Sequence, residues 1–272
     1  MAVRGVTQAR GSGMNAAGRR LLVAFETIAL REVRRFVRIW VQTILPPAVT
    51  MALYLVIFGG LIGSRVGEMA GYPYMDYIVP GVIMMAVITN SYSNVVSSFF
   101  GAKLQKHVEE MLVAPVPNTL IILGYAAGGV ARGLAVGLAV TAVSLLFTDL
   151  HVEHPAMAIL VVLLTSVLFS LAGFINAVFA KTFDDISIVP TFVLTPLTYL
   201  GGVFYSIQLL PAFWQKVSML NPILYMVDAF RFGILGISDI DILAGFTMIS
   251  VFIALLFAVC LVLLRSGVGV RS

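Results

Sequence analysis

The residues that could do chemistry are few in this chain. His151, Glu153 and His154 form a short His-x-Glu-His patch, and such side chains are ligands that zinc binds. Three ligands in one short loop are fewer than a structural zinc site needs, so a hydrated loop is the alternative interpretation. The single cysteine, Cys260, cannot form an intrachain disulfide. We therefore predict no metal site and no catalytic residue.

The sequence also lacks the known nucleotide and hydrolase motifs. It contains no Gly-Lys pair, and hence no G-x-x-x-x-G-K-[ST] phosphate-binding loop. Neither H-E-x-x-H nor G-x-S-x-G is present. The chain cannot use ATP through such a loop, and we expect no cofactor in it.

Polar side chains nevertheless recur inside apolar runs. One helical face of the run 77–100 carries several of them, and these are Asn90, Asn94, Ser97 and Ser98. Side chains of this kind either line a translocation pathway or form hydrogen bonds to a neighbouring helix. Arg132 lies about 18 Å into another run at 1.5 Å per residue. A charge there costs at least ~2.5–3.5 kcal/mol, so Arg132 either pairs with protein or contacts an anionic group of a substrate.

Composition indicates that these polar residues belong to a membrane protein. The chain has 272 residues, of which 60% are hydrophobic and 11% charged; soluble domains average about 25% charged. Seven stretches of 16 to 30 residues contain no Asp, Glu, Lys or Arg. About 20 helical residues cross a hydrocarbon core of roughly 30 Å. A soluble enzyme, a disordered chain and a disulfide scaffold are thereby excluded.

We predict an all-α membrane protein with six transmembrane helices. Their expected ranges are 41–63, 77–100, 120–147, 156–180, 187–206 and 242–264. Gly129, Gly133 and Gly137 give two G-x-x-x-G spacings in the third span, which allow close helix approach within one subunit. Pro190 and Pro196 predict a kink in the fifth span.

The charges predict the orientation. Placing the N-terminus in the cytoplasm puts 13 of the 17 lysines and arginines on the inner side, as positively charged cytoplasmic loops require. Both termini are then cytoplasmic. Eight arginines lie in the first 40 residues, which is typical of a cytoplasmic flank, so the net charge of +4 does not indicate nucleic acid. The N-terminus does not have the pattern of a cleavable signal peptide.

The expected domain organisation is simple. Residues 1–19 form a disordered N-terminal tail, within which Met14 is an alternative natural start. Residues 20–265 form the transmembrane domain, and residues 266–272 a cytoplasmic tail.

Residues 20–40 are predicted to form an amphipathic helix at the membrane interface. Its apolar side carries Leu21, Phe25, Ile28, Val33 and Phe36, and the other side carries Arg31, Arg34, Arg35 and Arg38. Glu32 interrupts the apolar stripe, and Arg35 three residues on offsets part of its charge. Trp40 is expected at headgroup depth, among membrane lipids.

Two further segments lie outside the spans. Residues 207–241 contain the breakers Pro211 and Asn221-Pro222, and short helices over 212–220 and 223–235 fit a re-entrant pair at the outer surface. A loop folded over that surface is the alternative.

The inner segment 101–117 predicts a short amphipathic helix that ends before Pro115. Its apolar stripe consists of Leu104, Val108, Met111 and Leu112, and its other faces carry Lys103, Lys106, Glu109 and Glu110, with His107 between them. Such a helix either docks another protein or rests on the membrane surface.

Longer strings resemble a known family. Glu-Glu-Met-Leu-Val-Ala-Pro-Val-Pro (109–117) resembles the signature after the second span of ABC-2 type exporter permeases. Pro-Leu-Thr-Tyr-Leu-Gly-Gly-Val-Phe-Tyr (196–205), followed by Leu-Pro at 210–211, Asn-Pro at 221–222 and Arg231, is similar to its second signature. The resemblance covers most of residues 20–265.

The resemblance implies a fold and a function. Such permeases have six spans, pair as homodimers in the bacterial plasma membrane and bind a separate ATP-binding subunit, which holds ATP and Mg. The helix at about 102–113 would be the coupling helix, and the segment with Pro211, Asn221, Pro222 and Arg231 would be re-entrant. Members export drugs, lipids or polysaccharides.

Two other classes of membrane protein predict different residues. An ion-coupled secondary carrier is expected to have carboxylates inside its spans, and a membrane-embedded enzyme a cluster of His, Asp or Glu at that depth. The predicted spans contain neither. We therefore predict a transporter permease that is not itself an enzyme.

Overall fold

The computed structural model describes residues 3–269, with the backbone only at residues 3–17, 61 and 64. Its elements are α1 Val3–Arg38, α2 Trp40–Tyr54, the π-helix η1 Leu55–Ile62, α3 Gly63–Val66, β1 Glu68–Met69, β2 Tyr72–Pro73, α4 Tyr74–Leu104, α5 His107–Val113, α6 Asn118–Ser144, α7 Pro155–Phe179, α8 Asp185–Val189, the π-helix η2 Pro190–Leu194, α9 Thr195–Tyr199, the 3₁₀ helix η3 Ile207–Leu209, α10 Ala212–Ser218, α11 Pro222–Leu235 and α12 Ile242–Ser266. The two short strands pair antiparallel, with Glu68 opposite Pro73 and Met69 opposite Tyr72.

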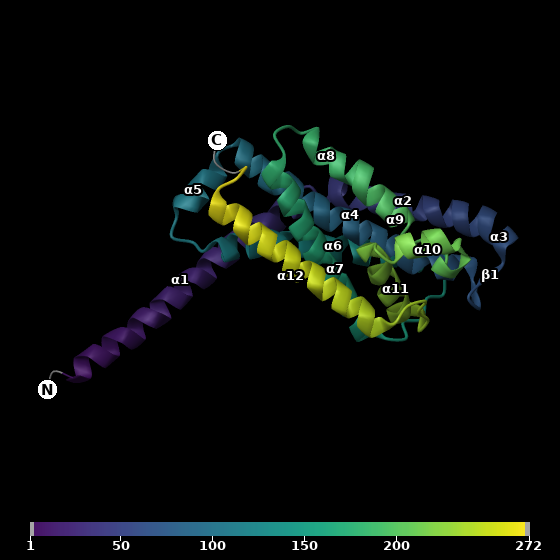
Figure 1. Cartoon of the computed structure of the whole chain (residues 1–272), viewed down its shortest axis with the longest axis horizontal. Helices are drawn as coiled ribbons and strands as arrows, with labels where there is room; N and C mark the ends of the chain where they lie inside the picture. Colours follow the sequence, from purple (N-terminus) through teal and green to yellow (C-terminus); the bar gives the residue numbers. More distant parts are fainter. Residues whose placement is uncertain (1–2, 270–272) are drawn as a thin grey trace.

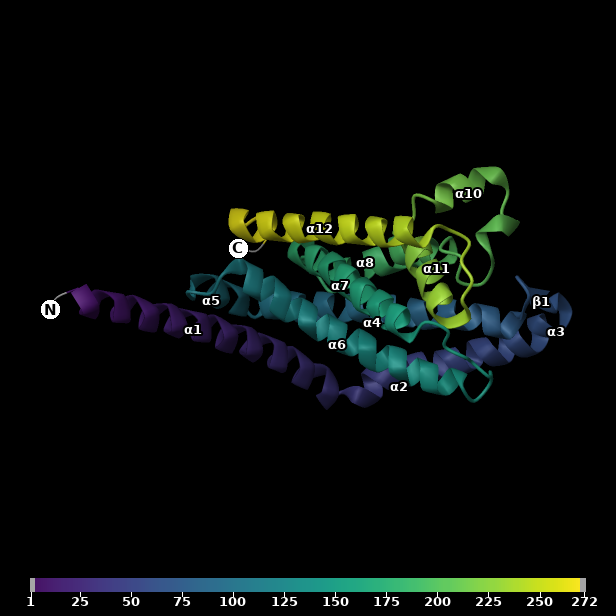
Figure 2. The ribbon, with the colours of Figure 1, turned by 90° about the horizontal axis from the view of Figure 1, so that it is seen from below.

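The long helices form a bundle around α4, which is the most buried of them and packs against α6 and α7. α2 and α12 lie on the outside of the bundle and are largely exposed. Figures 1 and 2 show the start of α1, α5 and the end of α12 toward one end of the molecule, and α3, β1 and α10 toward the other. We refer to these as the inner and the outer end.

Within the described residues, five helices are long and apolar enough to cross a membrane. They are Trp40–Gly60, Tyr74–Leu104, Asn118–Ser144, Pro155–Phe179 and Ile242–Ser266. These helices confirm five of the six predicted spans to within a few residues. The third span ends where expected on its inner side, because Pro115 and Pro117 lie outside helix in the turn before Asn118.

The predicted fifth span, 187–206 with a kink at its prolines, is present only as a shorter and broken helical segment, so a sixth crossing stays a prediction. α8, η2 and α9 together cover only 15 residues, about 22 Å at 1.5 Å per residue. Pro190 begins the π-helix, because a proline lacks the N–H of a regular turn. Residues 200–206 form a turn in which Gly202 has φ +69°. This broken segment leads from the inner end of α7 toward the outer end.

The prediction that the glycine spacings of α6 serve packing within one chain is confirmed. A Cβ at Gly129 would overlap Ser170 Oγ of α7 and lie 3.0 Å from the Ser91 carbonyl of α4. A Cβ at Gly133 would overlap Ser91 Oγ in the same way. The small residues therefore let α4, α6 and α7 approach closely.

The face of α1 that packs inward contains most of the predicted apolar stripe. Ile28 and Phe36 are buried, Phe25 and Val33 are half-buried, and Leu21 is 39% exposed. Glu32, which was expected to interrupt the stripe, is buried on the same face beside Arg35. Ile28 lies over Gly124 of α6 and Glu32 over Gly128, so α1 follows the inner half of α6. A position of α1 in the membrane interface stays a prediction. The two expected tails, 1–19 and 266–272, also stay predictions, and residues 1–2 and 270–272 lie outside the described part.

Replacing Gly128 by alanine tests the contact between α1 and α6. The new methyl group would collide with the Glu32 side chain, so we expect Gly128→Ala to destabilise the fold by about 1–3 kcal/mol. Gly101→Ala is the control, because nothing lies within 4 Å of a Cβ there. Thermal unfolding in detergent should show a lower midpoint for Gly128→Ala alone. Equal midpoints would contradict the packing.

Candidate functional site

The polar face of α4, formed by Asn90, Asn94, Ser97 and Ser98, is the point at which three helices meet. Arg132 of α6 donates from Nη2 to Asn90 Oδ1 at 2.9 Å. Arg35 of α1 donates from Nη2 to Asn94 Oδ1 at 2.9 Å and to the Asn94 carbonyl at 2.8 Å. Two guanidinium groups on different helices are thus held by amides that lie four residues, about one turn, apart on α4.

Glu32 is a buried carboxylate at this junction, with 1% of its surface exposed. Its Oε2 lies 3.4 Å from Arg35 Nε, and its Oε1 lies 3.2 Å from Arg31 Nη2. Arg31 Nη2 also donates to the Tyr125 hydroxyl of α6 at 2.7 Å. A buried charge is tolerated when it is paired, and two arginines pair with Glu32, although only its Oε1 accepts a hydrogen bond. The sequence signal was an acid flanked by arginines on its own helix.

Arg132 and Asn90 also line a cavity of about 360 Å³ between α2, α4 and α6, which we call the lateral cavity. Thr43, Thr50 and Thr89 add hydroxyl groups to its wall. A neighbouring cavity of about 180 Å³ lies between α2, α4 and the α8–α9 segment. Polar side chains therefore line open space beside α2 and the α8–α9 segment.

The four residues predicted to line a pathway do not lie together. Asn90 and Arg132 line the lateral cavity, and Ser97 lines a separate groove between α1 and α4. Asn94 is fully buried against Arg35. All of them make hydrogen bonds within the chain. Their part in transport stays a prediction.

α5 forms where the short amphipathic helix was expected, but it begins later. α4 continues to Leu104, and α5 starts only after Lys106, whose φ of +61° breaks the helix. Val108 of α5 is buried. Leu104 is exposed; it is the last residue of α4 and does not share the buried face of α5. A single helix over 102–113 was therefore wrong, although the end before Pro115 is confirmed.

The exposed side of α5 carries both charged and apolar side chains. Lys106, His107 and Glu110 are exposed, and Glu109 and Leu112 are half-buried. Val113, the last residue of α5, has 89% of its surface exposed. An exposed mixture of this kind at the end of a short helix suits contact with another protein.

Lys103 joins α4 to the neighbouring inner loop. Its Nζ donates to the carbonyls of Val178 and Ala180 at 2.6 and 2.8 Å, which are orphan acceptors at the end of α7. In the same loop, the Asp185 carboxylate accepts from the backbone N–H of Lys181 and of Thr182, and these bonds hold the pKa of Asp185 below its ordinary value. The end of α4 that leads into α5 is thereby tied to α7.

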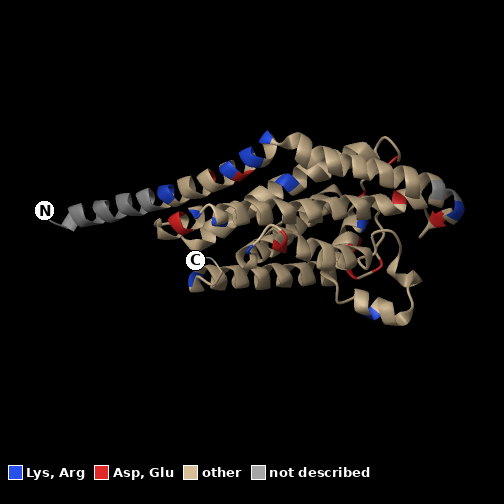
Figure 3. Ribbon diagram, turned by 90° about the horizontal axis from the view of Figure 1, so that it is seen from above, with Lys and Arg blue, Asp and Glu red and all other residues tan. Residues whose placement is uncertain are grey.

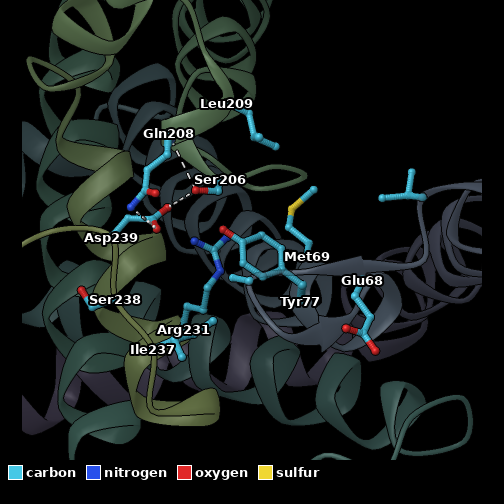
Figure 4. Close-up of a pocket in the computed structure, with 12 residues that line it drawn as sticks. Glu68, Met69, Tyr77, Ser206, Gln208, Leu209, Arg231, Ile237, Ser238 and Asp239 are labelled. Carbon is cyan, nitrogen blue, oxygen red and sulfur yellow. Dashed lines mark hydrogen bonds between the residues drawn. The ribbon is translucent and has the colours of Figure 1, made fainter.

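A second buried charge cluster lies at the outer end, around Arg231 of α11. The guanidinium donates from Nη2 to the Gly202 carbonyl at 2.6 Å, lies over the Tyr77 ring at 4.2 Å, and has Nη1 4.0 Å from Asp228 Oδ1. Figure 4 shows Arg231 beside Tyr77 at the edge of a cavity of about 520 Å³. In the lining of the same cavity, the Asp239 carboxylate accepts hydrogen bonds from the Ser206 hydroxyl and the Gln208 side-chain amide. The cluster fastens the turn after α9 to α11.

The residues Pro211, Asn221 and Pro222 shape the two short helices predicted here. Pro211 precedes α10, and Asn221 Oδ1 caps α11 by accepting from the Ile223 N–H at 3.0 Å. Asn221 Nδ2 donates to the Leu197 carbonyl at 2.6 Å, which binds α11 to α9. α11 is buried against α4, α7 and α12, whereas α10 projects from the bundle in Figure 2. Re-entry into the membrane stays a prediction.

The His-x-Glu-His patch has a structural contact. The His154 ring stacks on Phe232 with centroids 4.8 Å apart. Within residues 3–269, no group of three or more His, Cys, Asp or Glu side chains is arranged to hold a metal ion.

These features define a helical membrane protein with charged pairs inside its bundle and a short exposed helix at its inner end. Residues 23–235 match the ABC-2 type transporter family, and the chain belongs to that family.

Two kinds of relatives agree with this assignment. The chain is 60% identical over 250 residues to the "Inner membrane transport permease YadH" of Escherichia coli strain K12, and the alignment covers 92% of this chain and 98% of the relative. It has the same identity and coverage with the YadH of Shigella flexneri. It is 24% identical over 214 residues to "Nodulation protein J" of Rhizobium leguminosarum bv. viciae, covering 78% and 83% of the two chains.

Substituting Arg231 tests the outer cluster. Arg231→Met leaves Asp228 and the Gly202 carbonyl without a cationic partner, so we expect destabilisation by about 3–5 kcal/mol. Arg231→Lys should recover only part of this loss, because an ammonium lacks the planar fork of a guanidinium. The control is Lys216→Met on the exposed side of α10. A loss of folded protein as large in the control as in Arg231→Met would refute the assignment.

Proposed function

We propose that this chain is the membrane-spanning subunit of an ATP-driven exporter of the bacterial inner membrane. Two copies would bind two separate ATPase subunits, which hold ATP and Mg, and would move a drug, lipid or glycan-type substrate outward. The family match supports the class, and the printed name of the YadH relatives supports the inner membrane. The observation that carries the proposal is α5, an exposed short helix joined directly to the most buried helix of the bundle.

The contacts of α4 suggest how force from an ATPase would travel. A push on α5 reaches α4 through the Gln105–Lys106 joint, and Lys103 passes it to the end of α7. α4 is close-packed, so it moves as a rigid element rather than deforming locally. Its polar face would then carry α1 and α6 with it through Arg35 and Arg132.

The lateral cavity supports pairing of two copies. Its wall is built by α2, α4 and α6, and the adjoining cavity reaches α8–α9. Phe192 of η2 has 73% of its surface exposed beside this region, and α2 is largely exposed. A second copy related by a twofold axis would cover these surfaces and enclose the polar groups between the two chains. Thr89, Asn90 and Arg132 would then face the substrate.

The orientation follows from the same contacts and from charge. The inner end carries α5 and the arginine-rich α1, so we place it and both termini in the cytoplasm (Figure 3). The alternative is an ion-coupled carrier without an ATPase. It would need carboxylates in the spans, and the five long helices contain one, Asp76 in the first turn of α4.

Reversing the charge of α5 tests the coupling. Glu109→Lys combined with Glu110→Lys should lower substrate-stimulated ATP hydrolysis by the reconstituted complex about tenfold or more, because the two lysines reverse the charge that α5 presents to the ATPase. A tenfold weaker docking contact corresponds to a loss of about 1.4 kcal/mol in binding free energy. The thermal midpoint of the permease should stay the same. Arg65→Glu, an exposed charge reversal at the outer end, serves as the control.

Two results would contradict the proposal. Unchanged ATP hydrolysis in the double variant would remove α5 as the coupling helix. Transport by the purified chain in liposomes without any ATPase would remove the proposed class.

A further inference from the structure

The largest cavity among those described, about 870 Å³, lies between α1 and the inner half of α4. We call it the inner groove. Four arginines line it, together with one acid, the buried Glu32; the arginines are Arg31, Arg34, Arg35 and Arg38. Figure 3 shows basic residues gathered along α1 up to its junction with α2. The groove therefore has an excess of positive charge.

The arginines fall into two pairs. Arg31 and Arg35 are committed to Glu32, Tyr125 and Asn94, and they form the floor of the groove. Arg34 and Arg38 are exposed and make no hydrogen bond or ion pair with any residue that the structure describes. Glu32 is already neutralised on the floor. Two guanidinium groups are therefore available to an anion from outside the chain.

The depth of the groove indicates where that anion would come from. Ser97, the α4 residue of the groove lining that lies farthest from the inner end, is seven residues before the end of α4, about 10 Å along the helix. With the inner end at the membrane surface, as proposed above, the groove would reach from the headgroup layer to the edge of the hydrocarbon core, which is the depth of a lipid phosphate and its first acyl carbons.

The walls suit a molecule with an apolar tail. Leu30 and Ile39 line the groove and are 50% and 39% exposed. Val37 and Trp40, which continue along the same helices, are exposed as well. Ser97 and Ser98 on the opposite wall offer hydroxyl groups beside the arginines. A polar floor next to exposed apolar side chains matches an amphiphile better than a soluble ion.

We propose that the inner groove binds the phosphate group of an anionic amphiphile from the inner leaflet, with Arg34 and Arg38 as its ligands. A guanidinium matches the geometry of a phosphate through two parallel N–H donors, which a lysine cannot reproduce. This inference rests on the inner orientation proposed above. It concerns binding rather than transport, so it can fail while the proposed function holds.

The alternative occupants are less compatible with the geometry. An acidic surface of an ATPase subunit would have to reach about 10 Å along α4 from its inner end, past the exposed start of α5. Inorganic phosphate would use the arginines but not the apolar wall. Both alternatives give distinct results in the test.

The experiment measures lipid binding to the purified full-length permease in detergent. The probes are phosphatidylglycerol, a diacylglycerol that lacks the phosphate, and inorganic phosphate, each titrated and followed by native mass spectrometry and by thermal shift. Arg34→Gln with Arg38→Gln is the test variant. Arg19→Gln with Arg20→Gln is the matched control, because it removes the same charge from the same helix outside the groove.

We expect the unmodified chain and the control to retain phosphatidylglycerol and not diacylglycerol. The test variant should bind phosphatidylglycerol about tenfold or more weakly, since it loses two charge-assisted contacts. Arg34→Lys with Arg38→Lys should fall between the two, which separates a phosphate fork from general attraction.

Three results would overturn the proposal. Equal lipid affinity in the test variant and the control would show that the groove is not the site. Competition by inorganic phosphate at the same concentration as the lipid would assign a soluble anion. Unchanged lipid binding together with loss of ATPase co-purification in the test variant would assign the groove to the partner subunit.

Discussion

A charge inside a membrane bundle needs polar partners, and α4 supplies such partners in this chain. Asn90 holds Arg132, and Asn94 holds Arg35, which in turn neutralises the buried Glu32. An unpaired charge at this depth costs several kcal/mol, so the three helices that carry these groups are constrained to one arrangement. The glycines of α6 make the arrangement feasible, because they let α1 and α4 come close enough for the polar groups to meet.

The same constraint relates the two ends of the molecule. At the inner end, α5 follows α4 directly and Lys103 of α4 binds the end of α7, and at the outer end Tyr77 of α4 supports the Arg231 guanidinium. Arg231 binds the Gly202 carbonyl, so the broken fifth segment is held to α11 and α4 together. Packed contacts thus run continuously from α5 to the Arg231 cluster at the outer end. The proposed coupling to a separate ATPase depends on this continuity.

Much of this architecture could be predicted from the sequence, because apolar length and prolines act locally. Five spans, the turn at Pro115 and the break between two short helices at Asn221-Pro222 follow from such local rules. The rest depends on partners far away in the sequence. Arg35 and Asn94 are 59 residues apart, so the helical pattern of α1 indicated the pairing of Glu32 with Arg35 but not the contact of Arg35 with Asn94. The extent of the broken fifth segment was missed for a similar reason, since the turn at Gly202 is fixed by Arg231.

A double-mutant cycle at Arg35 and Asn94 tests the central claim that pairing on α4 holds the bundle together. The unfolding free energies of Arg35→Met, Asn94→Leu and the combined variant would be measured in detergent against the unmodified chain. The account predicts that the two substitutions are non-additive by about 0.5–2 kcal/mol, as expected for contacting polar groups in a membrane protein. Additivity within roughly 0.3–0.5 kcal/mol would contradict it, because independent sites behave in that way.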